Sequence, residues 1–205
     1  MIFPLKSVNK SIKILLFFLL VINTAAALWT PIFSIYVITQ VVGATLAIIG
    51  LTGVLYSITK SVLQIPIAKY LDSRAGEKDD FVTIFVGICL ASICSFSLLL
   101  VHQVWQLGFV QVTWGIADAC TFAAYYAIFS HHIDRKAAAF EWSLFSVGGM
   151  TVGGAVGGLI GGFVAQTYGF SVIFWAAGVI NVLALLLLVA LYPYLKIMRP
   201  KVVSE

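Results

Sequence analysis

The sequence has few charged residues, which make up only 10% of its 205 positions. A soluble domain carries about 25% charged residues, because its surface must stay hydrated. Hydrophobic residues make up 61% of the chain, and the mean hydropathy is +1.07. This composition excludes an ordinary soluble domain, and lipid is the expected solvent for most of the chain.

Metal-binding and catalytic patterns are also missing. Cys89, Cys94 and Cys120 lie in apolar runs without metal-ligand spacing, and we interpret them as small buried hydrophobic residues. The adjacent His131 and His132 would point to different faces of a helix, and no second ligand cluster accompanies them. A solvated loop is therefore the preferred interpretation of the two histidines. Since no nucleophile–base pair appears either, we expect no metal, no cofactor and no enzyme.

Long apolar stretches fill the sequence instead. A helix of about 20 apolar residues crosses the ~30 Å apolar core of a bilayer. Six such stretches occur, at roughly 12–38, 44–70, 81–101, 105–130, 137–166 and 170–195. No charged residue occurs from Trp142 to Leu195, which holds the last two stretches and the turn at 166–169. We expect an all-α integral membrane protein, in which residues 1–205 form a single six-helix transmembrane domain.

The basic residues predict the orientation of this domain. All but one lie before the first span, in the 2–3 and 4–5 connections or after the sixth span: Lys6, Lys10, Lys13, Lys69, Arg74, Lys78, Arg135, Lys136, Lys196, Arg199 and Lys201. The positive-inside rule assigns that side to the cytoplasm. Both termini are thus expected on the cytoplasmic side of the plasma (inner) membrane. Topology explains the net charge of +4, so nucleic acid is not an expected partner.

The N-terminal region also imitates a secretory signal. Basic residues within 6–13 precede an apolar run at 14–22 and three alanines at 25–27. Apolar residues continue to Val37, however, which is too long for a signal core. Cleavage would also leave five spans and break the charge pattern. We therefore interpret this region as the first span.

Residues 148–162, GGMTVGGAVGGLIGG, hold eight of the 17 glycines. A phosphate-binding loop would normally have Lys or Arg nearby, whereas the flanks here are apolar and uncharged. The glycines form two rows with a four-residue repeat: Gly149, Gly153, Gly157 and Gly161, and beside them Gly154, Gly158 and Gly162. On a membrane helix such rows let a second backbone approach closely. A fixed helix contact is favoured over a sliding one, and both stay open.

Two charges lie deep in the predicted spans, Lys60 and Asp118, and both are expected near the membrane midplane. A charge there costs about 2.5–3.5 kcal/mol, so it normally faces a cavity or a partner. A pair that merely fixes packing and a substrate or proton site are both compatible with the sequence. Polar or aromatic residues at helical spacing form stripes on the same spans and on the first: Asn23, Thr30, Ser34, Ser57, Ser61, Gln64, Gln111, Trp114, Thr121 and Tyr125. These stripes predict a water-accessible path for a solute.

The cytoplasmic 2–3 connection carries the first of several family motifs. The segment AKYLDSRAGEK at 68–78 is similar to G-x-x-x-D-R/K-x-G-R/K-R/K of the major facilitator superfamily. Asp72 stands on the motif's Asp, and Ala68 replaces its first Gly. Arg74, Gly76 and Lys78 follow after a one-residue insertion.

Three further segments resemble the same family in the same order. QVTWG at 111–115 stands where the family often has R-x-x-Q-G, with Gln111 in place of Arg. GGAVGG at 153–158 is similar to G-P-x-x-G-G, with Gly154 in place of Pro. YGFSVIFW at 168–175 resembles the start of the sixth helix. The chain as a whole therefore resembles one six-helix half, of the N-terminal type, of such a transporter.

The resemblance implies a 3+3 inverted-repeat bundle and a secondary transporter that moves a small solute by alternating access. It implies a cytoplasmic gate of Asp72, Arg74, Gly76 and Lys78, where Asp72 meets a neighbouring helix end or basic group. Asp118 would bind a proton or a cationic group, and the fifth-span glycines would belong to the moving seam. Because a complete transporter has two halves, we expect a parallel homodimer or a separate second-half polypeptide. The alternative is a non-transporting membrane subunit or scaffold.

Overall fold

The structure, a computed structural model, describes residues 8–74 and 76–195. Within these ranges six helices are long and apolar enough to cross a membrane, which is the predicted number. They cover Lys10–Gln40, Leu46–Asp72, Lys78–Leu100, Val104–His132, Ala138–Tyr168 and Phe170–Tyr194. Four basic residues of the orientation prediction, Lys6, Lys196, Arg199 and Lys201, lie outside the described residues.

Four of the spans consist mainly of one α-helix, and two are interrupted. The regular helices are α3 (Leu46–Asp72), α4 (Lys78–Ser97), α5 (Val104–His132) and α8 (Phe170–Leu191). The first span consists of α1 (Lys10–Ala27), a 3-10 turn at Thr30–Ile32 and α2 (Phe33–Gln40). The fifth consists of α6 (Ala138–Ser143), a π-helical segment η4 (Leu144–Val152) and α7 (Gly153–Tyr168). Pro31 lies in the 3-10 turn of the first span, and proline has no N–H to continue an α-helix.

Local side-chain chemistry fixes several helix ends. The side chains of Asn9 and Thr45 accept hydrogen bonds from backbone N–H groups in the first turns of α1 and α3. Such caps satisfy N–H groups that have no partner inside the helix. Gly169 joins α7 to α8 with a φ of 84°, a left-handed conformation that glycine adopts without strain.

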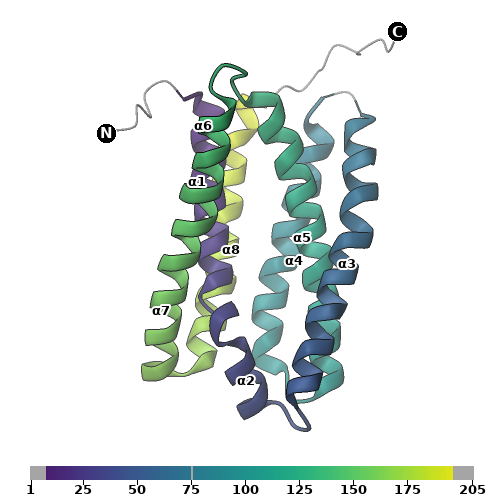
Figure 1. Cartoon of the computed structure of the whole chain (residues 1–205), viewed down its shortest axis with the longest axis vertical. Helices are drawn as coiled ribbons and strands as arrows, with labels where there is room; N and C mark the ends of the chain where they lie inside the picture. Colours follow the sequence, from purple (N-terminus) through teal and green to yellow (C-terminus); the bar gives the residue numbers. More distant parts are fainter. Residues whose placement is uncertain (1–7, 75, 196–205) are drawn as a thin grey trace.

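The spans form two groups of three (Figure 1). In one group α1 packs against η4, α7 and α8, and in the other α5 packs against α3 and α4. Contacts between α4 and α8 join the groups. The first span of the first half (α1) thus packs on the last two spans of the second half (α7 and α8). The first span of the second half (α5) in turn packs on the last two spans of the first half (α3 and α4). This exchange is consistent with the expected 3+3 inverted repeat.

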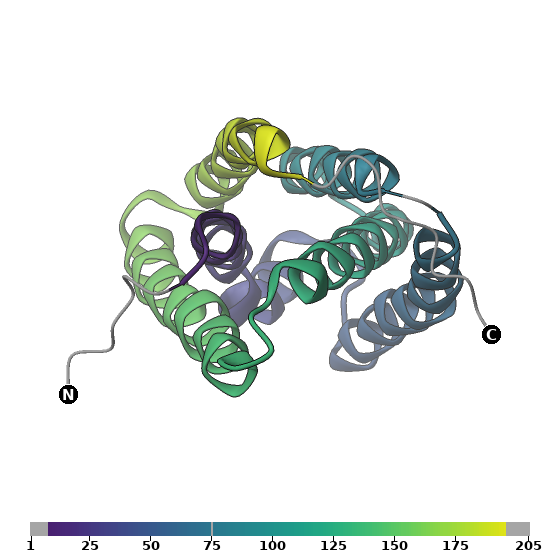
Figure 2. The ribbon, with the colours of Figure 1, turned by 90° about the horizontal axis from the view of Figure 1, so that it is seen from above.

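The view from above places the helices around the bundle (Figure 2). Helices α7 and α3 lie at opposite ends, α1 and α5 lie between them, and α8 and α4 lie along one side. The burial of the spans agrees with these positions. In the most apolar 18-residue stretch of each span, 56% of the fourth span is buried but only 6% of the second. Helix α5 is therefore central, whereas α3 is an edge that exposes about half of its apolar side chains.

Two hydrophobic clusters make up the core. One lies toward the end that holds the start of α1 and the end of α5, and includes Leu15, Phe129 and Leu188. The other lies toward the opposite end and includes Tyr36 and Phe174. The middle of the bundle, between the two clusters, holds the polar side chains described next.

Candidate functional site

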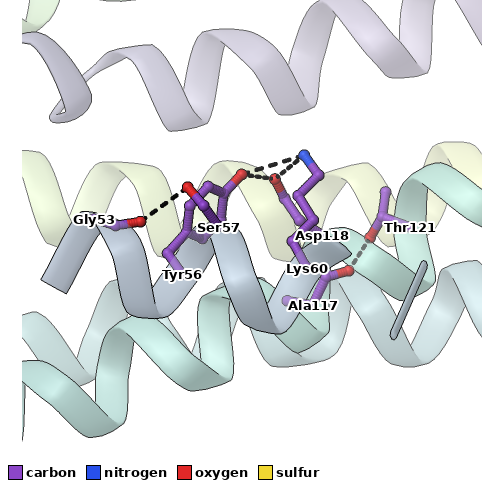
Figure 3. A network of polar contacts seen from close by, with 7 residues as sticks. All are labelled: Gly53, Tyr56, Ser57, Lys60, Ala117, Asp118 and Thr121. Carbon is purple, nitrogen blue, oxygen red and sulfur yellow. Dashed lines mark hydrogen bonds and ion pairs between the residues drawn. The ribbon is translucent and has the colours of Figure 1, made fainter. Parts of the chain in front are cut away.

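Lys60 and Asp118 meet at the middle of the bundle. Asp118 is the central residue of α5, and Lys60 lies next to the centre of α3. The Lys60 Nζ atom is 2.9 Å from Asp118 Oδ2 (Figure 3). Tyr56, one helical turn before Lys60, donates its hydroxyl to the same Oδ2 at 2.5 Å and accepts from Lys60 Nζ at 3.2 Å. The three side chains therefore form a closed triangle of polar contacts between α3 and α5.

Aromatic rings hold the ammonium group of Lys60 from other directions. The Nζ atom lies 4.5 Å from the ring centroid of Phe122 and 5.6 Å from that of Tyr56. A cation at such distances is attracted to the negative face of the ring. The pair is nevertheless open to solvent, because the side chains of Lys60 and Asp118 are 27% and 19% exposed. A solute in the bundle can therefore reach both charges.

The triangle lies on the wall of a cavity of about 360 Å³. Binding pockets for small molecules start at about 300 Å³. The first and fourth spans contribute most of the wall, with Ile22, Asn23, Ala26, Ala27 and Thr30 from the first and Trp114, Asp118, Thr121 and Phe122 from the fourth. The second, third and fifth spans contribute two residues each: Tyr56 and Lys60, Ile88 and Ala91, and Met150 and Gly154. The sixth adds Asn181. Among these described residues only Lys60 and Asp118 carry a charge.

The structure brings half of the predicted path residues to this cavity. Its wall includes Asn23, Thr30, Lys60, Trp114, Asp118 and Thr121. Two of them are held by their own helices, since Asn23 donates to the Leu19 carbonyl at 3.0 Å and Thr121 donates to the Ala117 carbonyl at 2.8 Å (Figure 3). Both side chains also contribute polar atoms to a wall that is otherwise largely apolar.

Six predicted path residues lie elsewhere, and three of them, Ser57, Ser61 and Gln64, lie on α3 outside the cavity wall. Tyr125 is fully buried in the core, and its hydroxyl donates to the Leu15 carbonyl of α1 at 3.1 Å. Gln111 is buried and Ser34 is exposed, and neither belongs to the cavity wall. For Gln111 and Tyr125 the reason lies in the packing of α5, because the ends of its stripe face other helices while the middle faces the cavity.

Sequence reasoning missed several members of the wall. Tyr56 and Phe122 contact the charged pair, and Met150 and Asn181 complete the lining. Tyr56 had a usable signal, because a residue four positions before Lys60 lies on the same helix face. Phe122 lies four positions after Asp118 and so shares a helix face with it in the same way. Aromatic residues are common in every span, however, and their spacing alone does not separate a site from the core.

The predicted cytoplasmic gate lies at the end of α3 and the start of α4. Arg74 lies over the Tyr70 ring at 4.8 Å and is 4.0 Å from the Asp79 carboxylate. Gly76 adopts a φ of 88°, which fits the turn, and Lys78 begins α4. Asp72 is exposed and forms no ion pair within residues 8–74 and 76–195. Its role as a latch stays a prediction.

The interpretation of His131 and His132 as a solvated loop is wrong. They are the last two residues of α5, and only 8% of His132 is exposed. The fully buried Glu77 lies between them, with Oε2 at 3.0 Å from His132 Nε2 and Oε1 at 3.4 Å from His131 Nδ1. A partner more than 50 positions earlier gives no local sequence signal. Within the described ranges, no group of three His, Cys, Asp or Glu residues is arranged to hold a metal.

The two glycine rows of the fifth span have different surroundings. A Cβ atom on Gly157 or Gly161 would overlap the backbone of α1 at Thr24 or Leu28, and Gly149 and Gly153 lie equally close to α1. In the second row, Gly154 and Gly162 have no atoms within 4 Å of such a Cβ, and Gly158 would only touch Pro31. The first row is therefore a close contact inside the bundle, whereas the second is largely bare.

The π-helical segment η4 precedes these rows and was not predicted. The Thr151 hydroxyl donates to the Ser146 carbonyl five residues earlier, at 3.0 Å. Such wide turns are rare and occur frequently at functional sites. Here the segment carries Met150 to the cavity wall.

A family model matches the chain. The family model described as Major Facilitator Superfamily matches residues 15–203, which is most of the chain. A search of curated proteins gives no match.

Proposed function

The chain belongs to the Major Facilitator Superfamily, and from this membership we propose that it is one half of a secondary transporter that moves a small solute by alternating access. Members of this family are transporters of the secondary type. The six membrane spans and the exchange of helices between the two halves of the chain fit one six-helix unit of such a protein.

The Lys60–Asp118 pair is the observation that carries this proposal. Both charges lie at the centres of their helices, where ionisable groups are costly and normally mark a solute or proton path. A pair needed only for packing would be sealed among side chains. This pair instead lines a cavity of about 360 Å³ and keeps part of its surface exposed.

A second six-helix unit would complete the path, and a second copy of this chain is the simplest source. Helices α3 and α7 lie at opposite ends of the bundle (Figure 2). A twofold axis along the membrane normal would therefore bring α3 of one copy against α7 of the other. Both helices offer small exposed positions for such a contact, since Gly50 and Gly53 on α3 and Gly162 on α7 have open space around them. A separate second-half polypeptide is the alternative partner.

The distribution of charge supports an orientation with both termini in the cytoplasm. The starts of α1, α4 and α6 lie at the same end of the bundle as the ends of α3, α5 and α8 (Figure 1). The described basic residues of the orientation prediction belong to these ends: Lys10, Lys13, Lys69, Arg74, Lys78, Arg135 and Lys136. In this arrangement the protein spans the plasma (inner) membrane. Movement of the two six-helix units relative to each other opens the cavity first to one side of the membrane and then to the other.

Solute flux into proteoliposomes tests the function. The purified protein is reconstituted and given small carboxylates, amines and sugars, with and without an imposed proton gradient. We expect saturable uptake of one class that responds to the gradient, and loss of this response in Asp118→Asn. The control is Asp79→Asn, which removes a half-exposed carboxylate away from the cavity. Absence of flux for all classes, together with stable association with a larger membrane protein, would favour the scaffold alternative.

A further inference from the structure

We propose that the cavity takes a small monocarboxylate, which binds the Lys60 ammonium in place of Asp118, and that the released Asp118 then takes up one proton. This inference rests on the proposed transport function and assigns its substrate class. It keeps the predicted proton-binding role of Asp118 and assigns the contact with the solute to Lys60. In the structure the Oδ2 atom of that carboxylate accepts hydrogen bonds from both Lys60 and Tyr56.

The hydrogen-bonding capacity of the triangle points to Lys60 as the group that meets the solute. An ammonium has three N–H donors, and those of Lys60 make two hydrogen bonds, to Asp118 Oδ2 and to the Tyr56 hydroxyl oxygen. Asp118 Oδ2 already accepts from both neighbours. Because Lys60 is the one cation among the described lining residues, it is the group that an anionic solute would bind.

The surroundings also decide which member of the pair keeps its charge when they separate. Lys60 retains the faces of Phe122 and Tyr56, which favour an ammonium without help from Asp118. Asp118 has no second cation in the described wall, whereas the Tyr56 hydroxyl can still hydrogen-bond to a neutral acid. Lys60 therefore stays charged, and Asp118 becomes neutral.

The other titratable groups around Asp118 do not replace the missing cation. Tyr56 and Lys60 face it from α3, Cys94 lies near it on α4, and Tyr126 follows on its own helix. The described lining residues from the first, fifth and sixth spans are uncharged. A carboxylate released from Lys60 would thus be a lone charge in the membrane interior unless it binds a proton.

The charges balance at each step. Before binding, the ammonium of Lys60 and the carboxylate of Asp118 sum to zero. The solute carboxylate adds one negative charge, and one proton from water forms an O–H bond on Asp118, so the loaded cavity is neutral again. Release of the solute restores the Lys60–Asp118 pair and returns the proton. Solute and proton therefore move together in the same direction.

The rest of the wall limits the solute. One ammonium pairs with one carboxylate, so a monocarboxylate fits the charge of the cavity. Trp114 and Phe122 give it aromatic surface, and Ile22 and Ile88 add apolar surface. A carboxylic acid with a short apolar or aromatic body matches this lining and the volume of about 360 Å³.

A matched set of probes tests the proposal. Benzoate, benzylamine and benzyl alcohol share one ring and differ in charge, and propionate, propylamine and propanol do so for a short chain. Each is titrated into purified protein in lipid nanodiscs at pH 7, with calorimetry for binding and an indicator dye in weak buffer for protons. We expect binding of a carboxylate, with uptake of about one proton per bound anion, and at least tenfold weaker binding of the amine and the alcohol.

Variants assign the two roles. Lys60→Met should weaken carboxylate binding at least tenfold, whereas Lys60→Arg, which keeps the cation, should restore most of it. Asp118→Asn should bind the carboxylate as well as the parent protein or better, but without proton uptake. Lys60→Met alone leaves the Asp118 carboxylate without its cation, which could destabilise the fold. The double variant Lys60→Met with Asp118→Asn has no such unpaired charge. Weak carboxylate binding by the double variant is therefore due to the missing cation and not to unfolding.

Several results would overturn the proposal. They are proton release on amine binding, carboxylate binding that is independent of Lys60 or without proton uptake, and no binding of either carboxylate. Failure of the transport function is distinguishable from failure of this inference. Flux of amines or neutral solutes keeps the transporter and removes the carboxylate assignment. Carboxylate binding with proton uptake, but without flux in proteoliposomes, keeps the site and removes the transport function.

Discussion

At the scale of single residues, the sequence could predict a site residue only where its residue type is rare in membrane spans. Lys60 and Asp118 stood out because charges are rare in apolar spans, and the structure joins them in one ion pair. Tyr56 and Phe122 did not stand out, because aromatic residues occur in every span and serve the core more often than a site. The pairing of Glu77 with His132 depends on how the end of α5 meets the start of α4, which no local pattern predicts.

Tyr56→Phe tests the polar triangle. The change removes the hydroxyl that bonds to Asp118 Oδ2 but keeps the ring near Lys60. We expect the free energy of unfolding to fall by about 1.5–3 kcal/mol, since hydrogen bonds to charged groups contribute on that order. Thermal or denaturant unfolding in detergent measures the loss. Tyr126→Phe is the matched control, because the Tyr126 hydroxyl has no hydrogen bond to the described residues. An equal loss of unfolding free energy in both variants would contradict a contribution of the polar triangle to stability.

At the scale of elements, the six spans followed from apolar length alone, while the irregularity of the fifth span did not. The π-helical segment at 144–152 has no distinct sequence pattern, so the fifth span was expected to be one regular helix. The glycine repeat correctly indicated membrane-helix packing rather than a phosphate loop, but it could not separate the two rows. The structure separates them, because α1 covers one row and leaves the other largely open.

Alanine substitutions in neighbouring glycines test this difference. Gly161→Ala places a methyl group on the backbone of α1 at Leu28, whereas Gly162→Ala places it in open space. We expect Gly161→Ala to lower the free energy of unfolding by about 1–3 kcal/mol, the usual cost of overpacking. Gly162→Ala should leave the unfolding midpoint of the single six-helix unit unchanged or slightly raised, because alanine favours helix. The reverse order of the two midpoints is incompatible with the packing described.

At the scale of the whole molecule, the number of spans and the family follow from the sequence, and the assembly does not. Apolar length and motif order were enough to predict half of a major facilitator transporter, because both depend on residues that are close in sequence. The partner depends on surfaces outside the chain. The proposed contact between copies involves α3 and α7, which lie at opposite ends of the bundle (Figure 2).

Disulfide cross-linking tests the proposed contact between copies. Gly53 on α3 and Gly162 on α7 both lie about 10 Å along the helix from the same end of the bundle, at 1.5 Å per residue. In a variant without the three native cysteines, Gly53→Cys with Gly162→Cys should give a cross-linked dimer on oxidation. A cysteine in place of Val182, an exposed residue of α8 in the peripheral sixth span, should not. Equal cross-linking of both variants, or of neither, contradicts the proposed arrangement.

Accessibility of the cavity from the two sides of the membrane tests the central claim most directly, because it needs no knowledge of the solute. Ala26 lines the cavity and is close in size to cysteine, and Val182 on α8 serves again as the control. Ala26→Cys, without the native cysteines, is treated with a membrane-impermeant thiol reagent in right-side-out and in inside-out vesicles. Alternating access predicts modification of Ala26→Cys from both sides and little modification of Val182→Cys from either. Modification of Ala26→Cys from one side alone, or from neither, would contradict a transporter.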